Sequence, residues 1–447
     1  MLKTSRFFSL LYIPGFKPLA AATLMLGVAM SFTAPYLSLF GVERAGMTPL
    51  RLGIFMTLIA ASGVLASTLA GRWSDASGRH RPLLLAALVA AALGYLSLCV
   101  VRDYRLLLVV GIVFIGAGGS AISMVFSFSR AALPVPDPAE RVFASATLRT
   151  ILSAAWVFGP SVGALVLAAT SFYGLFLFAA ASFATCAFIV WRMREPQSHL
   201  GDHTVEDTAA EPSASITVPP LTAPGEDAHE TLPTASANDI MRAVAALTLL
   251  GLAANATMIV LPLYIVHGLN GSHLDVSVML GLGALTEIPM MLALGAKSSS
   301  LHKPNWLAAC AAVHAVYFVA MSLAGSINVL IPMQMLNAFV VAVTSCLGMT
   351  YVQDLMPHAP GRATALFFNA ARVGSILSGV LSGLLVQAFS YRGTFLFCGL
   401  LGLCALVLFA VPGYRYPLMW RAIRRFAAAQ YARWLARRGG RMPERSE

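Results

Sequence analysis

The chain has 447 residues, of which 58% are hydrophobic and only 11% are charged. Soluble domains typically contain ~25% charged residues, so this composition excludes a soluble globular protein and indicates an integral membrane protein. Its spans are predicted to be helices, because the apolar runs are too long and continuous for the strands of a membrane barrel. The net charge of +11 does not indicate a nucleic-acid partner, because basic cytoplasmic loops and a basic tail account for it.

Twelve apolar runs follow one another along the chain, and each is long enough to cross the hydrocarbon core as a helix. Six runs precede a polar segment and six follow it, which predicts two six-helix halves at residues 1–194 and 240–412. The spans are predicted at about 17–41, 50–71, 82–101, 105–131, 142–168, 170–192, 240–266, 274–296, 305–324, 327–353, 362–388 and 392–412.

Two polar segments lie outside these runs. Residues 195–239 are rich in Ala, Thr, Ser, Pro and acids and contain no Lys or Arg, so we expect a disordered cytoplasmic linker that joins the halves. Residues 413–447 mix arginines with apolar residues that include Trp420 and Trp434. This pattern is typical of an amphipathic helix lying on anionic lipid, although a disordered basic tail is the alternative.

Basic residues are distributed unevenly between the two sides of the predicted bundle. The richer side includes both termini, and the other side carries Arg44, Arg51, Arg102, Arg105 and Arg392. Cytoplasmic loops carry the excess of Lys and Arg. We therefore expect a multi-pass protein of a bacterial-type inner (plasma) membrane with both termini in the cytoplasm.

A charged loop, residues 71–82, separates the second and third runs. Asp75 lies at a predicted helix end within reach of Arg79 and Arg81, so the loop is predicted to act as a charged latch on the cytoplasmic face. Arg130 and Asp354 close spans 4 and 10 on the same side and are candidates for further latches between the halves. The alternative interpretation is an ordinary basic loop with interfacial anchors.

The two halves contain an internal repeat. Pro35 and Tyr36 near the end of span 1 correspond to Pro262 and Tyr264 in span 7, and both halves have an arginine-led motif in their fifth span. Related six-span halves are typical of transporters built from parallel repeats. Runs of small residues at 116–120 and 374–383 predict close contacts between helices.

Several segments of the chain resemble known transporters. The loop form Gly-x-x-x-Asp-x-x-Gly-Arg-x-Arg resembles the loop between spans 2 and 3 of the major facilitator superfamily, and five further segments resemble its sugar efflux transporter family. The segments are Gly71–Arg81, Pro35–Phe40, Leu148–Pro160, Leu285–Pro289, Tyr351–Pro357 and Asn369–Gly374. The resemblance implies an all-α major facilitator fold of twelve transmembrane helices in two pseudo-symmetric halves. It also implies export of sugars or small glycosides, driven by protons.

Glu287 is the clearest candidate for coupling transport to protons. It lies near the middle of span 8, where an ionisable group is costly unless it faces a cavity or a partner. Pro289, two residues further on, leaves a backbone carbonyl free. The alternative is a structural acid that an arginine of a neighbouring helix neutralises.

Uncharged polar groups suit a sugar, whose hydroxyls need donors and acceptors in a fixed arrangement. The candidates near mid-membrane are Asn255, Gln334, Asn337 and Asn369, and Trp156 offers an aromatic face for a sugar ring. Each of these residues alone is more often a packing or interhelical hydrogen-bonding residue.

Arg149 and Arg372 occupy repeat-related places in spans 5 and 11. At ~1.5 Å per residue they lie roughly 12–15 Å into the membrane, where they are candidates to pair with carboxylates or to donate to sugar hydroxyls. The alternatives are side chains that extend back to the cytoplasmic surface and salt bridges between the halves.

Other functions compete with that of a sugar exporter. A major facilitator exporter of drugs or amphiphiles would have a more hydrophobic cavity with one acid. A non-transporting membrane sensor is a third hypothesis. An enzyme is not expected, because the sequence has no metalloprotease motif and no phosphate loop. The six cysteines all lie in apolar runs without a CxxC motif, so no disulfide, metal site or cofactor is expected.

Overall fold

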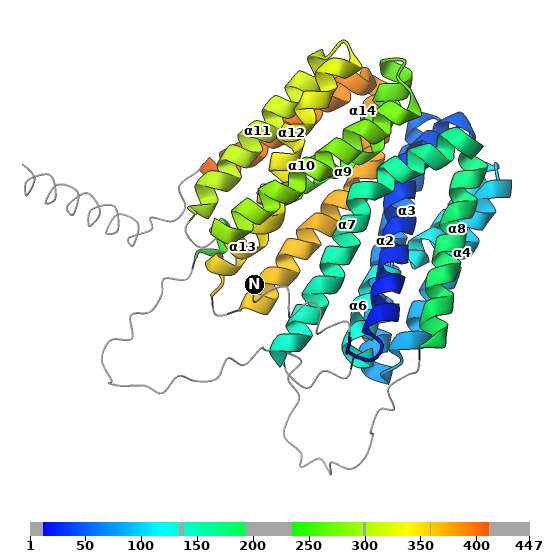
Figure 1. Ribbon diagram of the computed structural model, residues 1–447. Helices are drawn as coiled ribbons and strands as arrows, with labels where there is room; N and C mark the ends of the chain where they lie inside the picture. Colours follow the sequence, from blue (N-terminus) through cyan, green and yellow to red (C-terminus); the bar gives the residue numbers. More distant parts are fainter. Residues whose placement is uncertain (1–11, 134–137, 194–234, 298–300, 358, 411–447) are drawn as a thin grey trace, which may run out of the picture.

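The computed structural model describes residues 12–133, 138–193, 235–297, 301–357 and 359–410, and all its regular elements are helices (Figure 1). The first half contains α2 (Phe16–Glu43), α3 (Pro49–Ser77), α4 (His80–Val100), α5 (Tyr104–Val109), η1 (Val110–Gly116), α6 (Ala121–Ala132), α7 (Pro138–Thr170) and α8 (Phe172–Arg192). The second half contains α9 (Ala237–Leu263), η2 (Tyr264–Gly268), α10 (His273–Lys297), α11 (Lys303–Leu323), α12 (Ile327–Val343), η3 (Thr344–Gly348), α13 (Met349–Leu355) and α14 (Pro360–Ala410). The predicted tail and most of the predicted linker lie outside the described residues.

Among the described residues, eleven helices are long and apolar enough to cross a membrane. The last one runs for 49 residues, Arg362–Ala410, although ~20 residues are enough to cross the hydrocarbon core. Its backbone leaves the helical region at Ser390, where φ is 62° and ψ is −177°. We therefore divide α14 at Ser390 into two spans, and with this division each predicted span has a counterpart within a few residues.

The repeat between the halves extends to their backbone irregularities. Ser171, between α7 and α8, has φ 94° and ψ 179°, close to the unusual conformation of Ser390 at the corresponding junction of the second half. This backbone region strongly favours glycine and costs ~1–3 kcal/mol for other residues. The fourth span of each half also contains a π-helical stretch, residues 110–116 and 344–348.

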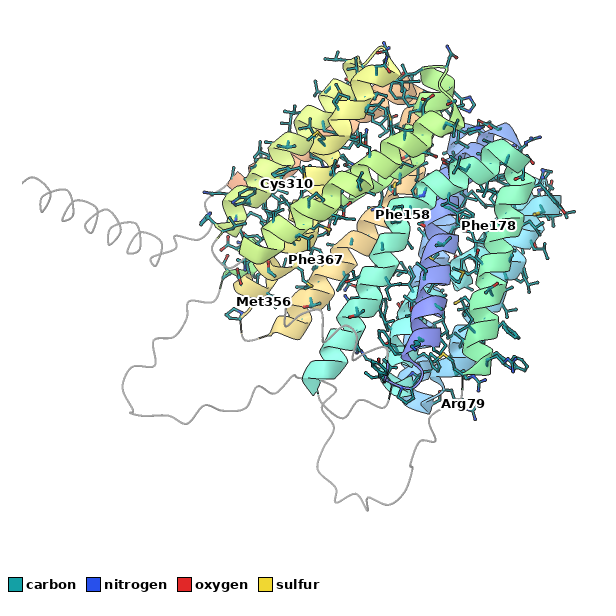
Figure 2. The ribbon with its side chains drawn as sticks, in the orientation of Figure 1. Arg79, Phe158, Phe178, Cys310, Met356 and Phe367 are labelled. Carbon is teal, nitrogen blue, oxygen red and sulfur yellow. The ribbon has the colours of Figure 1, made fainter. Side chains whose placement is uncertain are left out.

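The helix order places two sets of loops at opposite ends of the bundle. We call the end with loop 78–79 the basic end, and the end with loops 44–48 and 269–272 the opposite end. Arg79 of the first half and Met356 of the second half mark the basic end in Figure 2. All helices of one half lie beside each other, with the first half on the right of Figure 1 and the second half on the left.

The halves meet most closely where α3 crosses α14, near the opposite end. The backbone oxygen of Gly53 lies only 2.8 Å from the place where a Cβ atom on Gly379 would stand. The hydroxyl of Thr57 donates to the carbonyl of Ile376 at 2.9 Å and accepts from the amide of Val380 at 2.8 Å. Only small residues permit such an approach, which confirms the close contact predicted for 374–383.

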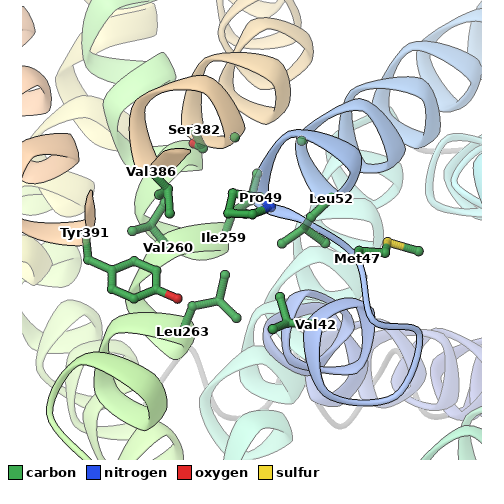
Figure 3. Close-up of a pocket in the computed structure, with 12 residues that line it drawn as sticks. Val42, Met47, Pro49, Leu52, Ile259, Val260, Leu263, Ser382, Val386 and Tyr391 are labelled. Atoms are coloured by element: carbon green, nitrogen blue, oxygen red, sulfur yellow. The ribbon is translucent and has the colours of Figure 1, made fainter. Parts of the chain in front are cut away.

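Apolar side chains seal the same contact on the side nearer the opposite end. Val42 and Leu52 of the first half and Val260 and Tyr391 of the second half line a small pocket of about 50 Å³ there (Figure 3). Because the halves are packed and hydrogen-bonded at this level, the bundle is closed at the opposite end.

A bulky residue at Gly379 should separate the halves at this crossing. Gly379→Leu should lower the unfolding temperature of the purified protein, because its Cβ would lie 2.4 Å from the Thr57 hydroxyl oxygen and overpacking costs ~1–3 kcal/mol. The matched control is Gly71→Leu in α3, where an added Cβ meets no atom within 4 Å. Equal unfolding temperatures for the two variants would contradict the proposed role of this crossing.

Candidate functional site

A cavity of about 430 Å³ lies between the two halves. It is lined by α2 and α7 of the first half and by α9, α10 and α12 of the second half. Most of its wall is apolar, and its apolar side chains include Met258, Leu261, Leu280, Ile288, Met291 and Val341. The volume falls within the ~300–1,000 Å³ typical of small-molecule sites.

The cavity brings together five of the residues that the sequence predicted to carry transport. They are Trp156, Asn255, Glu287, Gln334 and Asn337. These residues come from four different helices and from both halves, so their convergence depends on the packing of the whole bundle. Ser31 and Thr257 also line the cavity, and they could not be singled out from the sequence, because hydroxyl residues are common in membrane helices.

The three amide side chains differ in whether they hydrogen-bond to neighbouring backbone carbonyls. The amide nitrogen of Asn255 donates to the Gly251 carbonyl at 2.7 Å, and that of Gln334 lies 3.5 Å from the Leu330 carbonyl. Asn337 has no side-chain hydrogen bond to another described residue. Asn337 is therefore the amide most available to a ligand, and Asn255 and Gln334 can still offer their carbonyl oxygens.

Among the residues that the structure describes, Glu287 is the one acid that lines this cavity. Glu287 is half-buried. It has no ion-pair partner among the described residues. The predicted alternative, an arginine from a neighbouring helix, is not found within ion-pair distance in the described part of the chain. An uncompensated carboxylate in mostly apolar surroundings is costly, and uptake of a proton or of a cationic or hydroxylated ligand reduces that cost.

Trp156 also lines a second cavity, of about 320 Å³, inside the first half. This second cavity is bounded by Tyr95, Phe183 and several glycines and is almost entirely apolar. The indole therefore forms part of the wall between the two spaces, and one of its sides is available to a ligand in the central cavity.

Three residues hold the halves together beside the cavity. The hydroxyls of Tyr36 and Ser277 both donate to the carbonyl of Pro160 at 3.0 Å, and they contact each other. Tyr36 and Pro160 belong to the first half and Ser277 to the second, and Pro160 also lines the cavity. This bridge was not predicted from the sequence, although the Pro35-Tyr36 motif that contains Tyr36 was identified there.

Three predicted binding residues do not line the cavity. Arg149, Asn369 and Arg372 are exposed in the structure. The guanidinium of Arg149 lies 5.3 Å from the ring centroid of Phe126, within its own half, at a distance typical of cation–π contacts.

Two of the predicted latch residues, Arg81 and Asp354, contact their own halves. Arg81 donates to the Trp191 carbonyl at the end of α8, and Lys303 pairs with Asp354 at 2.5 Å within the second half. Arg79 and Arg130 are exposed, and the side chain of Asp75 lies outside the described part of the structure. In this conformation, the described latch residues form no ion pair between the halves.

Known proteins resemble both the sequence and the repeat of this chain. The family model of the Major Facilitator Superfamily matches residues 19–378 and, a second time, residues 243–420. A Deinococcus radiodurans protein whose name places it among the sugar efflux transporters is 38% identical over 87% of this chain and 95% of its own length. The chain belongs to the sugar efflux transporter family of the major facilitator superfamily.

Two further members of the sugar efflux transporter family extend the comparison. Sugar efflux transporter B of Salmonella typhimurium is 31% identical over 83% of this chain and 88% of its own length. Sugar efflux transporter C of Escherichia coli is 29% identical over 86% of this chain and 92% of its own length.

Solved structures agree with the fold. The nucleoside transporter NupG superposes with a TM-score of 0.69 at 13% identity, over 90% of this chain and 99% of its own. A bacterial homologue of the lysosomal transporter Spinster, in an inward-facing and occupied conformation, superposes with a TM-score of 0.66 at 10% identity. The superposition covers 88% of this chain and 95% of that structure's chain. At these identities the likeness shows the fold alone, and it confirms the predicted major facilitator fold.

Filling the central cavity should block this transporter without unfolding it. Gly283→Leu places a side chain in the cavity, and its Cβ would meet nothing closer than 4.0 Å. We expect an unfolding temperature near that of the wild type, together with loss of transport in proteoliposomes. The control is Gly325→Leu, in a loop at the opposite end where a Cβ has open space, and transport at the wild-type rate by Gly283→Leu would exclude this cavity as the route.

Proposed function

We propose that this protein exports sugars or small glycosides across a bacterial inner membrane by alternating access. The observation that carries the proposal is the cavity between the halves, in which three amides, one acid and one tryptophan converge at mid-span. Amides offer both donors and acceptors to sugar hydroxyls, and Trp156 offers a face for a pyranose ring. The names of the relatives agree with this substrate class.

The conformation of the structure supports one state of the proposed cycle. The halves are joined at the opposite end through Thr57 and through the Tyr36–Ser277 bridge. At the basic end, Arg81 and Asp354 contact their own halves, and Arg79 and Arg130 are exposed. In the other state, the opposite end opens and the basic end closes. Asp75, Arg79, Arg81, Arg130 and Asp354 are then the charges available for contacts at the basic end.

The orientation follows from the basic residues. We place the basic end in the cytoplasm, because short loops rich in Lys and Arg remain there. Both termini of the chain are on this side and are therefore placed in the cytoplasm as well. The halves at 1–194 and 240–412 are then joined by a cytoplasmic linker. The basic segment 413–447 would bind anionic lipid of the inner leaflet.

Glu287 is the proposed proton carrier. Its position in the cavity lets a proton and a sugar compete for the same space, so that release of one accompanies binding of the other. Such competition gives proton antiport without a second site in the membrane.

An exporter of drugs or amphiphiles is the second candidate function. It is favoured by the apolar majority of the cavity wall, which includes two methionines, Met258 and Met291. Methionine side chains adapt to irregular apolar ligands. The two functions differ in what the amides contribute, since an apolar ligand leaves them without partners.

The deciding experiment is transport into proteoliposomes, with and without an imposed pH gradient. The labelled solutes are lactose, glucose, a thiogalactoside and a lipophilic cation. Gradient-stimulated movement of a sugar but not of the cation supports sugar–proton antiport. Movement of the cation alone favours the drug exporter.

Glu287→Gln should abolish transport driven by the pH gradient but leave exchange of labelled for unlabelled solute measurable. The amide retains the shape of the side chain and cannot release a proton. Asp275→Asn is the matched control, because it removes an acid from the same helix outside the cavity. Full gradient-driven flux in Glu287→Gln would contradict its role as the proton carrier.

Asn337→Ala should raise the KM for the sugar by roughly tenfold, because a ligand hydroxyl then loses its partner in a desolvated site. Asn328→Ala is the control, since Asn328 is an exposed asparagine at the start of α12, outside the cavity. Initial rates in proteoliposomes measure both variants. An unchanged KM for Asn337→Ala would place the sugar elsewhere.

A further inference from the structure

At the opposite end, one carboxylate of the first half faces two histidines of the second half. Glu43 is the last residue of α2, and its Oε1 lies 3.6 Å from Nε2 of His267 and 3.2 Å from Nε2 of His273. The side chain of Glu43 is 21% exposed and each histidine 33%. The cluster is therefore partly buried and still reachable by protons from solvent on this side.

Aromatic packing fixes the position of this cluster. The ring of His273 meets Phe172 edge-on, with centroids 5.9 Å apart, and Phe172 in turn contacts Phe40, whose centroid lies 6.0 Å away. Phe40 is one helical turn before Glu43. The contact between the halves is thus supported by rings of α2, α8 and α10.

The place of Glu43 makes a cationic partner favourable. The carbonyl groups at the C-terminus of a helix carry partial negative charge, so an acid there is destabilised unless a cation compensates it. Histidine is the side chain that gains and loses its charge between about pH 5 and 8. Protonated His267 and His273 would supply the missing compensation.

Other ionisable groups at this end are engaged elsewhere or stand apart. The carboxylate of Asp275 accepts from the backbone nitrogen and hydroxyl of Ser272, both at 2.8 Å. Arg102 donates to the Leu98 carbonyl at 2.6 Å and lies over the ring of Phe40. Tyr264 donates to the Ala324 carbonyl at 2.8 Å. The other described groups at this end form no ion pair with the cluster, and they are Arg44, Arg51, Cys99, Asp103, Tyr104, Arg105, Tyr173, Tyr391 and Arg392.

We propose that Glu43, His267 and His273 form a proton-binding latch that holds the two halves closed at the opposite end. Protonated forms of the two histidines attract Glu43 and favour the closed state, whereas their neutral forms lack this attraction. The latch thus binds protons at a site separate from Glu287 and lies between the same two halves.

This inference rests on alternating access as proposed above, and it adds a direction to the cycle. In an antiporter that takes protons from the opposite side, acid on that side would favour closure there and return the cavity to the basic end. Each charged histidine should change the ratio of closed to open molecules by roughly two- to fivefold, as expected for a partly exposed ion pair.

The test is a distance measurement between spin labels across the opposite end. Val100→Cys at the end of α4 and Leu323→Cys at the end of α11 provide exposed sites, 81% and 76% exposed, one in each half. Cys346 and the exposed Cys404 are replaced by alanine. Electron–electron double resonance on the full-length protein in lipid nanodiscs, with a chelator and without solute, then reports closed and open populations from about pH 8 to pH 5.

The closed population of the wild-type background should grow as the pH falls. His267→Gln/His273→Gln should flatten this dependence, each single substitution should remove part of it, and Glu43→Gln should also flatten it. Asp275→Asn should retain the wild-type dependence, because the Asp275 carboxylate is bonded to Ser272 and forms no ion pair with the histidines. A double histidine variant with the wild-type pH dependence would overturn the proposal.

The same data separate this proposal from alternating access itself. If closed and open populations are both present but their ratio does not change with pH, the latch proposal is contradicted and alternating access is not. A single distance at every pH would contradict the two-state cycle on which both proposals depend. Solute identity does not enter, since the labels report conformation without any sugar.

Discussion

The close approach of α3 and α14 at Gly53, Gly379 and Gly383 determines how the two halves meet. In lipid, apolar side chains gain little by leaving one apolar neighbour for another, so helices associate through close packing and interhelical hydrogen bonds. Small residues let the two backbones meet, and Thr57 then bonds to the main chain of α14. The closed opposite end and the position of the cavity both follow from this crossing.

The closed end also explains where polar groups are found. Polar side chains in a membrane protein need partners or a cavity. Near the opposite end, the hydroxyls of Tyr36 and Ser277 both donate to the Pro160 carbonyl and contact each other across the halves. Toward mid-span, Asn337 and Glu287 line the cavity without a protein partner among the described residues, so their hydrogen-bonding groups are available to a ligand.

The sequence predicted the helices better than the contacts between them. Span positions follow from runs of apolar residues, and mid-span polarity is rare enough that Glu287, Asn255 and Asn337 could be identified before they were seen to converge. The bridge of Tyr36 to Ser277 could not be predicted, because serine and tyrosine are ordinary in such helices and their pairing depends on how two distant spans are placed. The same holds for Lys303 with Asp354, since the pattern of charges does not indicate which half supplies the partner.

Charged contacts differ between the two ends of the bundle. At the basic end, Asp354 and Arg81 are engaged within their own halves, so that end has no ion pair between the halves among the described residues. At the opposite end, Glu43 faces histidines of the other half, and the surrounding rings hold it there. A permanent ion pair at this position would bias the bundle towards one state under all conditions, whereas histidine lets the bias vary with proton concentration. Residues that hold charge only conditionally are therefore suited to the end that opens and closes in the proposed cycle, and the permanent charge of Arg81 suits a contact that persists within one half.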